Sequence, residues 1–131
     1  MIHAFASDAA LDHVGLYGQF LERESDQSGT VVLHHGLVKR PGKQVPDFSR
    51  VRLDAVCDDP DALLLGIARA AAERFGLNQA LVAHRLGTVK GGDTVLIAIV
   101  SARARDASFQ ACAWIVDEVK KEEIIRLVEE A

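Results

Sequence analysis

The sequence of 131 residues predicts a mixed α+β fold, in which an antiparallel sheet is covered by helices. The first observation is an alternation of segment types, because stretches with helical spacing of apolar residues are interleaved with β-branched or alternating stretches in the order α-β-β-α-β-β-α. The second is that turn-forming residues separate consecutive strands twice, which predicts two hairpins. The length is typical of one domain, so we expect residues 1–131 to form a single unit.

The first half of the chain supplies one helix and two strands. Residues 11–23 carry apolar side chains three and four positions apart, and Asp8 is a candidate cap for this helix. Residues 29–38 are rich in β-branched side chains and predict a strand. Residues 39–47 contain prolines and a glycine and predict a loop, and residues 48–57 alternate as a half-buried strand does.

The second half begins with the most clearly marked helix. Asp59 is a good cap, Pro60 fits the first helical position, and Gly76 is a typical stop. Residues 80–86 and 95–100 then predict two strands, the second of which is apolar at consecutive positions and therefore central.

A last helix is predicted over residues 105–121. Its apolar face is expected to carry Phe109, Cys112, Val116 and Val119. The apolar residues of the segment 122–131 also follow helical spacing, which predicts that this helix continues.

The charge distribution excludes some classes of function. The chain has 15 Lys and Arg against 19 Asp and Glu, a net charge of -4, which argues against a general nucleic-acid binder. Residues 29–52 are nonetheless basic, with five cations against Asp47 alone. Such a patch suits a small anionic ligand or an acidic partner surface, and the alternative is a solvated loop.

Neither a metal site nor a membrane segment is predicted. Cys57 and Cys112 are far apart and form no C-x-x-C motif. The adjacent His34 and His35 would point to opposite faces of a strand, so we expect one in the core and one in solvent. No signal peptide is visible and the apolar run Val95–Val100 is too short to span a bilayer, so we expect a cytoplasmic protein.

Four cations flank the last predicted helix. Arg103 and Arg105 lie between a strand and that helix, where free backbone N–H groups favour anions, although both could also be solvated loop residues. Lys120 and Lys121 lie at the end of the helix, where lysine complements the helix dipole. The functional alternative is a lysine that acts as a nucleophile or in acid–base chemistry.

Several motifs occur together in one order. They are Ala83-His84-Arg85-Leu86-Gly87, Gly92-Asp93, Arg105 followed by Phe109-Gln110-Ala111-Cys112, and the strand Gly29–Lys39 with Gly36 and Val38. In this order and at about this spacing the chain resembles the MoaE family, the large subunits of molybdopterin synthase. The resemblance covers roughly residues 10–121 and implies an α/β-hammerhead type of fold.

The resemblance also implies an activity and partners. Members of the family form homodimers, receive the C-terminal tail of a small ubiquitin-like MoaD-type subunit, and transfer sulfur from its thiocarboxylate to cyclic pyranopterin monophosphate. No cofactor is implied. Lys120 matches the catalytic lysine, with Lys121 as the adjacent candidate. A phosphate-bearing pterin needs cations, which Lys39, Arg40, Arg103 and Arg105 would supply.

The chain departs from the family at two positions. Ala104 replaces the histidine that normally precedes the pocket arginine, and Leu127 falls where a second lysine is usual. Two alternatives to the sulfur-transferring synthase subunit therefore stay open. One is a non-catalytic paralogue that acts as a binding or regulatory partner, and the other is a pterin-binding module.

Overall fold

The computed structural model describes residues 1–131, and the expected α+β class is confirmed. In chain order the elements are β1 (Ile2–Ser7), α1 (His13–Glu22), β2 (Thr30–Leu37), β3 (Arg50–Ala55), α2 (Pro60–Phe75), β4 (Gln79–Arg85), β5 (Gly87–Val89), β6 (Thr94–Ala102), α3 (Arg105–Val119) and β7 (Ile125–Glu130). None of the three helices combines the length and apolarity needed to cross a membrane.

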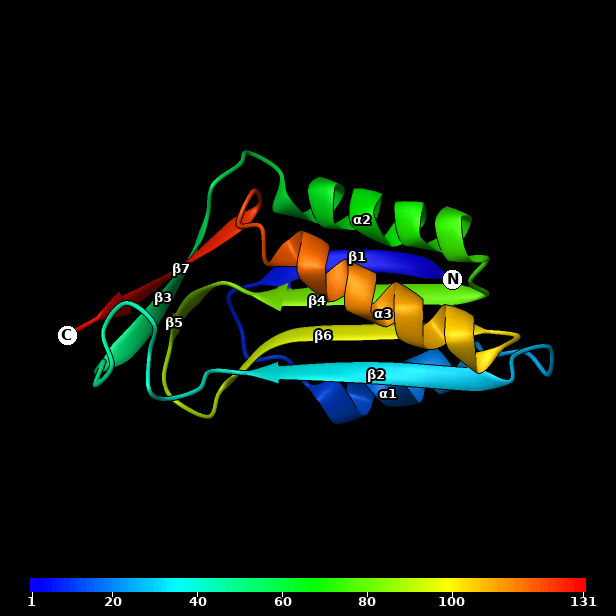
Figure 1. The fold of residues 1–131 in the computed structure, drawn as a ribbon, viewed down its shortest axis with the longest axis horizontal. Coiled ribbons are helices and arrows are strands. Elements are labelled where there is room, and N and C mark those ends of the chain that lie inside the picture. Colours follow the sequence, from blue (N-terminus) through cyan, green and yellow to red (C-terminus); the bar gives the residue numbers. More distant parts are fainter.

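A four-stranded sheet in the order β1-β4-β6-β2 forms the centre of the molecule. Helices α2 and α3 cover one face and α1 covers the other, as Figure 1 shows. Alternate residues of the central strands serve the two layers, so that Val82 and Ala98 face α2 and α3 while Leu81 and Ile97 face the side of α1. Burial on both faces explains why β6 is a continuous apolar run.

A second sheet, in the order β5-β3-β7, lies at one end of the first (Figure 1). Its inward side chains Val51 and Leu53 are fully buried and belong to the same apolar cluster as the residues beneath α2 and α3. The two sheets therefore share one core.

The helix signals in the sequence are partly confirmed. In α2 the Asp59 carboxylate accepts from the amide of Ala62, Pro60 is the first residue, and Gly76 ends the helix at a φ of 65°. In α1 the prediction of Asp8 as the cap was wrong, because the Asp12 carboxylate accepts from the amide of Gly15 at 3.0 Å.

The predicted face of α3 needs one correction. Phe109 is 59% exposed, and the buried residues of the helix are Ser108, Ala111, Cys112, Ile115, Val116 and Val119.

The predicted order α-β-β-α-β-β-α lacked three strands and contained one wrong hairpin. The strand β1 was missed because it pairs in parallel with β4, so its partner lies far along the chain (Ile2 opposite Ala80). The strands β2 and β3 form no hairpin, since β2 pairs with β6 and β3 pairs with β5 and β7. The second predicted hairpin is confirmed, because β4 and β6 are antiparallel neighbours, and the short strand β5 lies in their connection.

The helix predicted over residues 122–131 was also wrong, because this segment contains the strand β7. Glu122 adopts a positive φ of 59° after α3 has ended, and its carboxylate accepts from the amide of Leu127. The following residues pair with β3, with Leu127 opposite Leu53. A tertiary partner thus overrides the local spacing of apolar side chains.

Candidate functional site

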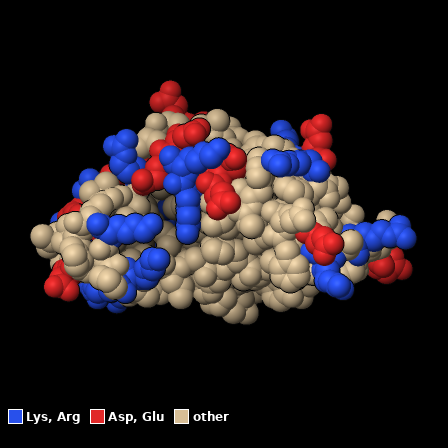
Figure 2. Space-filling model, viewed as in Figure 1, with Lys and Arg blue, Asp and Glu red and all other residues tan.

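The predicted cations divide between the two ends of the molecule. Lys39 and Arg40 follow β2, and Lys120 and Lys121 follow α3, so all four lie at the end that carries the second sheet. Figure 2 shows Lys and Arg side chains gathered over this end, with acidic side chains close by.

Arg103 and Arg105 lie at the opposite end. Residue Ala102 at the end of β6 pairs with Thr30 at the start of β2, and Arg105 begins α3. The 15 residues of α3, at about 1.5 Å each, place roughly 22 Å between Arg105 and Lys120. One chain therefore does not bring all the predicted site residues together.

The Arg40 side chain binds Phe48 and so stabilises the loop between β2 and β3. Its guanidinium carbon lies 4.6 Å from the ring centre of Phe48, and the group donates to the Phe48 carbonyl oxygen at 2.8 Å. Gly91 leaves room for this arrangement, because a Cβ there would lie 3.2 Å from the Arg40 guanidinium. Lys39, in contrast, is exposed and makes no ion pair, so it is free to bind an anion.

The remaining charges of the basic stretch are largely neutralised by β7. Arg50 and Arg52 both pair with the carboxylate of Glu130. The Glu129 carboxylate accepts from three successive backbone amides, those of Lys43, Gln44 and Val45, at 3.1, 2.6 and 2.8 Å. These N–H groups, that of Val45 foremost, hold the pKa of Glu129 below its usual range. Glu129 therefore organises the loop of residues 39–47, the basic loop, while Glu130 neutralises two arginines of the adjacent strand β3.

Lys120 and Lys121 have different surroundings. The Lys121 ammonium pairs with the Glu118 carboxylate at 2.9 Å, and this contact raises the pKa of Lys121. Lys120 is exposed and forms no ion pair. The pKa of His34 in β2 is lowered, first by burial of the imidazole and second by the positive charge of Lys120. The two lysines therefore differ in their partners, since only Lys121 has a carboxylate bound to its ammonium group.

Sequence reasoning did not select His34 as a candidate site residue, although it lies on β2, which ends just before Lys39. The prediction that His34 and His35 point to opposite faces is confirmed, but both rings are half-buried rather than one in the core and one in solvent. His35 stacks on His13 with 4.3 Å between ring centres and hydrogen-bonds to the hydroxyl of Thr94. The His34 ring extends over Gly36, where a Cβ would lie 3.0 Å from Nε2, and that nitrogen is buried without a partner. The glycine two residues later was the available signal.

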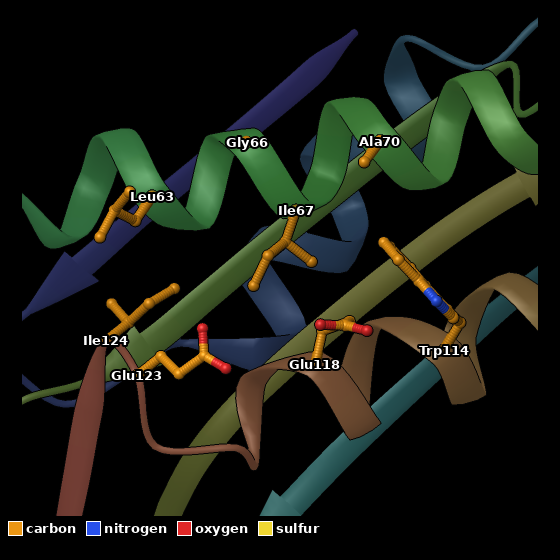
Figure 3. A pocket seen from close by; sticks show the side chains of 8 residues that line it. All are labelled: Leu63, Gly66, Ile67, Ala70, Trp114, Glu118, Glu123 and Ile124. Atoms are coloured by element: carbon orange, nitrogen blue, oxygen red, sulfur yellow. The ribbon is translucent and has the colours of Figure 1, made fainter.

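A groove of about 300 Å³ lies on the other side of α3, between this helix and α2 (Figure 3). Its lining is mostly apolar, with the Trp114 ring of α3 reaching toward Ala70 of α2, and the Glu118 and Glu123 side chains lie on the side of the groove opposite α2. None of the predicted cations lines the groove, and its two carboxylates do not suit a phosphate. No cluster of three or more His, Cys, Asp or Glu side chains that could hold a metal ion occurs in the chain.

Comparisons with known proteins identify the family of the chain. The profile of the family described as MoaE protein matches residues 7–122. A molybdopterin synthase catalytic subunit from Pyrococcus abyssi is 47% identical over 55 residues, which are 42% of this chain and 37% of that protein. The chain spans less than two thirds of the length of curated relatives that it matches.

Solved structures share the fold. A molybdopterin biosynthesis MoaE protein from Burkholderia ambifaria matches with a TM-score of 0.81 and 18% identity, over 98% of this chain and 86% of the other. A chain of the complex of subunits 1 and 2 of the molybdopterin-converting factor from Helicobacter pylori matches with a TM-score of 0.69 and 16% identity, over 96% and 83%. The profile match covers most of the sequence and the fold agrees throughout, and the chain therefore belongs to the MoaE protein family.

Proposed function

We propose that the chain is the catalytic subunit of a molybdopterin synthase, which transfers sulfur from the thiocarboxylate of a small-subunit tail to cyclic pyranopterin monophosphate. The observation that carries the proposal is Lys120, a lysine free of ion pairs at the end of α3 and at the same end of the molecule as Lys39. The Helicobacter pylori relative was solved as a complex of two subunits, which supports a small protein partner.

The two lysines would divide the chemistry. Lys39 is exposed and would bind the phosphate of the pterin as a point charge. Lys120 has no carboxylate to hold its ammonium group, so its amine is available to the incoming tail. There its ammonium group would stabilise developing negative charge, or its neutral amine would attack the tail carbonyl carbon once the sulfur has bonded to the pterin. In the second case an amide forms as the acyl C–S bond breaks, the sulfur stays on the pterin, and the amine proton passes to solvent.

A second copy of the chain would complete the site. The length of α3 separates Arg103 and Arg105 from Lys120 within one chain. If all these cations serve one substrate, the two arginines must come from the other subunit of a homodimer. Each dimer would then contain two shared sites.

The first experiment tests the activity. The protein is mixed with a thiocarboxylated small subunit and cyclic pyranopterin monophosphate, and molybdopterin is quantified. We expect Lys120→Ala to lose about 100-fold or more in turnover, whereas the neighbouring variant Lys121→Ala keeps most of it. A wild-type mixture that forms no molybdopterin would contradict the proposal and favour a non-catalytic binding or regulatory role.

The second experiment tests the shared site by mixing two inactive variants, Lys120→Ala and Arg105→Ala. In a mixed dimer one site would carry both substitutions and the other would carry none. Random exchange of subunits in an equal mixture should therefore restore about a quarter of the wild-type activity. If each site is built from one chain, the mixture stays inactive.

A further inference from the structure

His34 lies on the face of β2 that α3 covers. It is paired with Ala98, which belongs to the core beneath α2 and α3, and Cys112 of α3 lies against its backbone. The ring is directed along the strand over Gly36, toward the end that carries Lys39. The imidazole therefore extends from the middle of β2 toward the end of the molecule at which Lys39 and Lys120 lie.

One ring nitrogen of His34 has no hydrogen-bond partner. Nε2 of His34 is buried and has no hydrogen-bond partner, whereas Nε2 of the neighbouring His35 is bonded to Thr94. Buried polar atoms are normally paired, so an unpaired one needs a reason. The pKa of His34 lies below its usual range, mainly because the ring is buried and further because of the nearby charges of Lys120 and His35. The ring is therefore neutral at pH 7. A neutral imidazole has one nitrogen that accepts a hydrogen bond.

Lys120 lacks an acceptor of its own. An ammonium group has three donors and no acceptor. Of the nearby carboxylates, Glu118 is paired with Lys121, and Glu122 accepts from the amide of Leu127. Asp117 and Glu123 act on Lys121 as well. The acidic side chains at this end of α3 thus interact with the neighbouring Lys121 or with the backbone. The His34 ring extends over Gly36 toward the end of the molecule at which α3 ends and Lys120 lies, and the Lys120 charge contributes to its lowered pKa.

We propose that His34 is a positioning residue for Lys120. When the lysine side chain rotates inward and the imidazole turns enough to uncover the buried Nε2, this nitrogen accepts a hydrogen bond from the ammonium group and holds it near the end of β2. Protonation of His34 at low pH removes the acceptor and places two cations side by side, which displaces the lysine. The role in sulfur transfer rests on the proposed function, whereas the contact between the two side chains does not.

The contact is tested without any activity. The full chain carrying ¹⁵N-labelled histidine is titrated by NMR, and the His34 signal is assigned from its loss in His34→Gln. We expect the midpoint of His34 to move to higher pH in Lys120→Gln and to stay unchanged in the matched control Lys121→Gln. An unchanged midpoint in Lys120→Gln, or equal shifts in the two variants, would overturn the proposal even if the enzyme is active.

The role in catalysis is tested by turnover in the complete mixture. His34→Phe keeps an aromatic ring but removes the acceptor, and it should lower kcat by about tenfold or more with little change in KM for the pterin. The fall of activity on the acidic side of the pH profile should disappear in this variant, and His34→Gln, whose amide oxygen accepts, should recover much of kcat. A His34→Phe enzyme with wild-type kcat and pH profile would overturn the proposal. An inactive wild-type mixture would contradict the proposed function and leave the NMR result to decide the contact.

Discussion

Phe48 connects the basic loop to the core, and its replacement by alanine is the sharpest test of how that loop is held. The side chain is 1% exposed and belongs to the apolar cluster that both sheets share. The Arg40 guanidinium lies over the ring, so the variant Phe48→Ala also removes the surface on which Arg40 rests.

The expected loss of stability follows from this burial. Truncation of a fully buried phenylalanine to alanine costs about 3 to 5 kcal/mol of the free energy of unfolding. With a denaturant dependence of about 2 kcal/mol per molar urea, typical of small proteins, the unfolding midpoint should fall by roughly 1.5 to 2.5 M urea. The loop amides of residues 43–45 should also exchange their hydrogens faster in native conditions, because the loop loses its anchor.

The assay is urea unfolding followed by circular dichroism at one fixed protein concentration. Phe109→Ala is the control, because this phenylalanine is 59% exposed and should cost no more than about 0.5 kcal/mol. A midpoint for Phe48→Ala within about 0.3 M of wild type, or equal shifts for the two variants, would refute the assignment of Phe48 as the anchor.

Two further predictions concern titratable groups. The Glu129 carboxylate has a lowered pKa in the folded chain, so its contribution to loop order is complete above the ordinary glutamate pKa and is lost only as the pH falls through the lower folded value. Protection of the amides of residues 43–45 against hydrogen exchange, taken relative to the intrinsic rate at each pH, should therefore persist until the pH falls below the ordinary glutamate pKa. Glu129→Gln should lose this protection already at neutral pH, and equal protection in the two proteins would contradict this role. Burial raises the pKa of Cys112 to about 11, so its thiol should resist iodoacetamide at pH 8 while the half-buried Cys57 reacts. Mass spectrometry of the two peptides measures this, and equal labelling would show that α3 opens readily.

The elements that the sequence predicted well are those with local signals. Asp59, Pro60 and Gly76 mark the two ends of α2 without help from the rest of the fold. The strand β1 carries no comparable signal, since its partner β4 begins far along the chain. The segment β7 is compatible with either a helix or a strand by its apolar spacing, and only β3 decides between them.

The candidate site was predicted in the same uneven way. Lys39 and Lys120 could be chosen from the sequence because the resemblance marks their positions. The engagement of Arg40 by Phe48 and of Lys121 by Glu118 depends on contacts that no pattern of residue types specifies. The separation of Arg105 from Lys120, in contrast, already follows from the helix predicted over residues 105–121, and α3 over Arg105–Val119 confirms it.

The pairing of β3 with β7 bears on how the protein is made. Arg50 lies opposite Glu130, so the second sheet joins residues that leave the ribosome 80 residues apart. The basic loop is synthesised early, whereas Glu129, whose carboxylate accepts hydrogen bonds from three amides of this loop, is synthesised only with β7. The first sheet's β2, β4 and β6 can pair before this point, because all three precede β7 in the chain. The lysine-bearing end of the molecule should therefore be the last part to become ordered during synthesis.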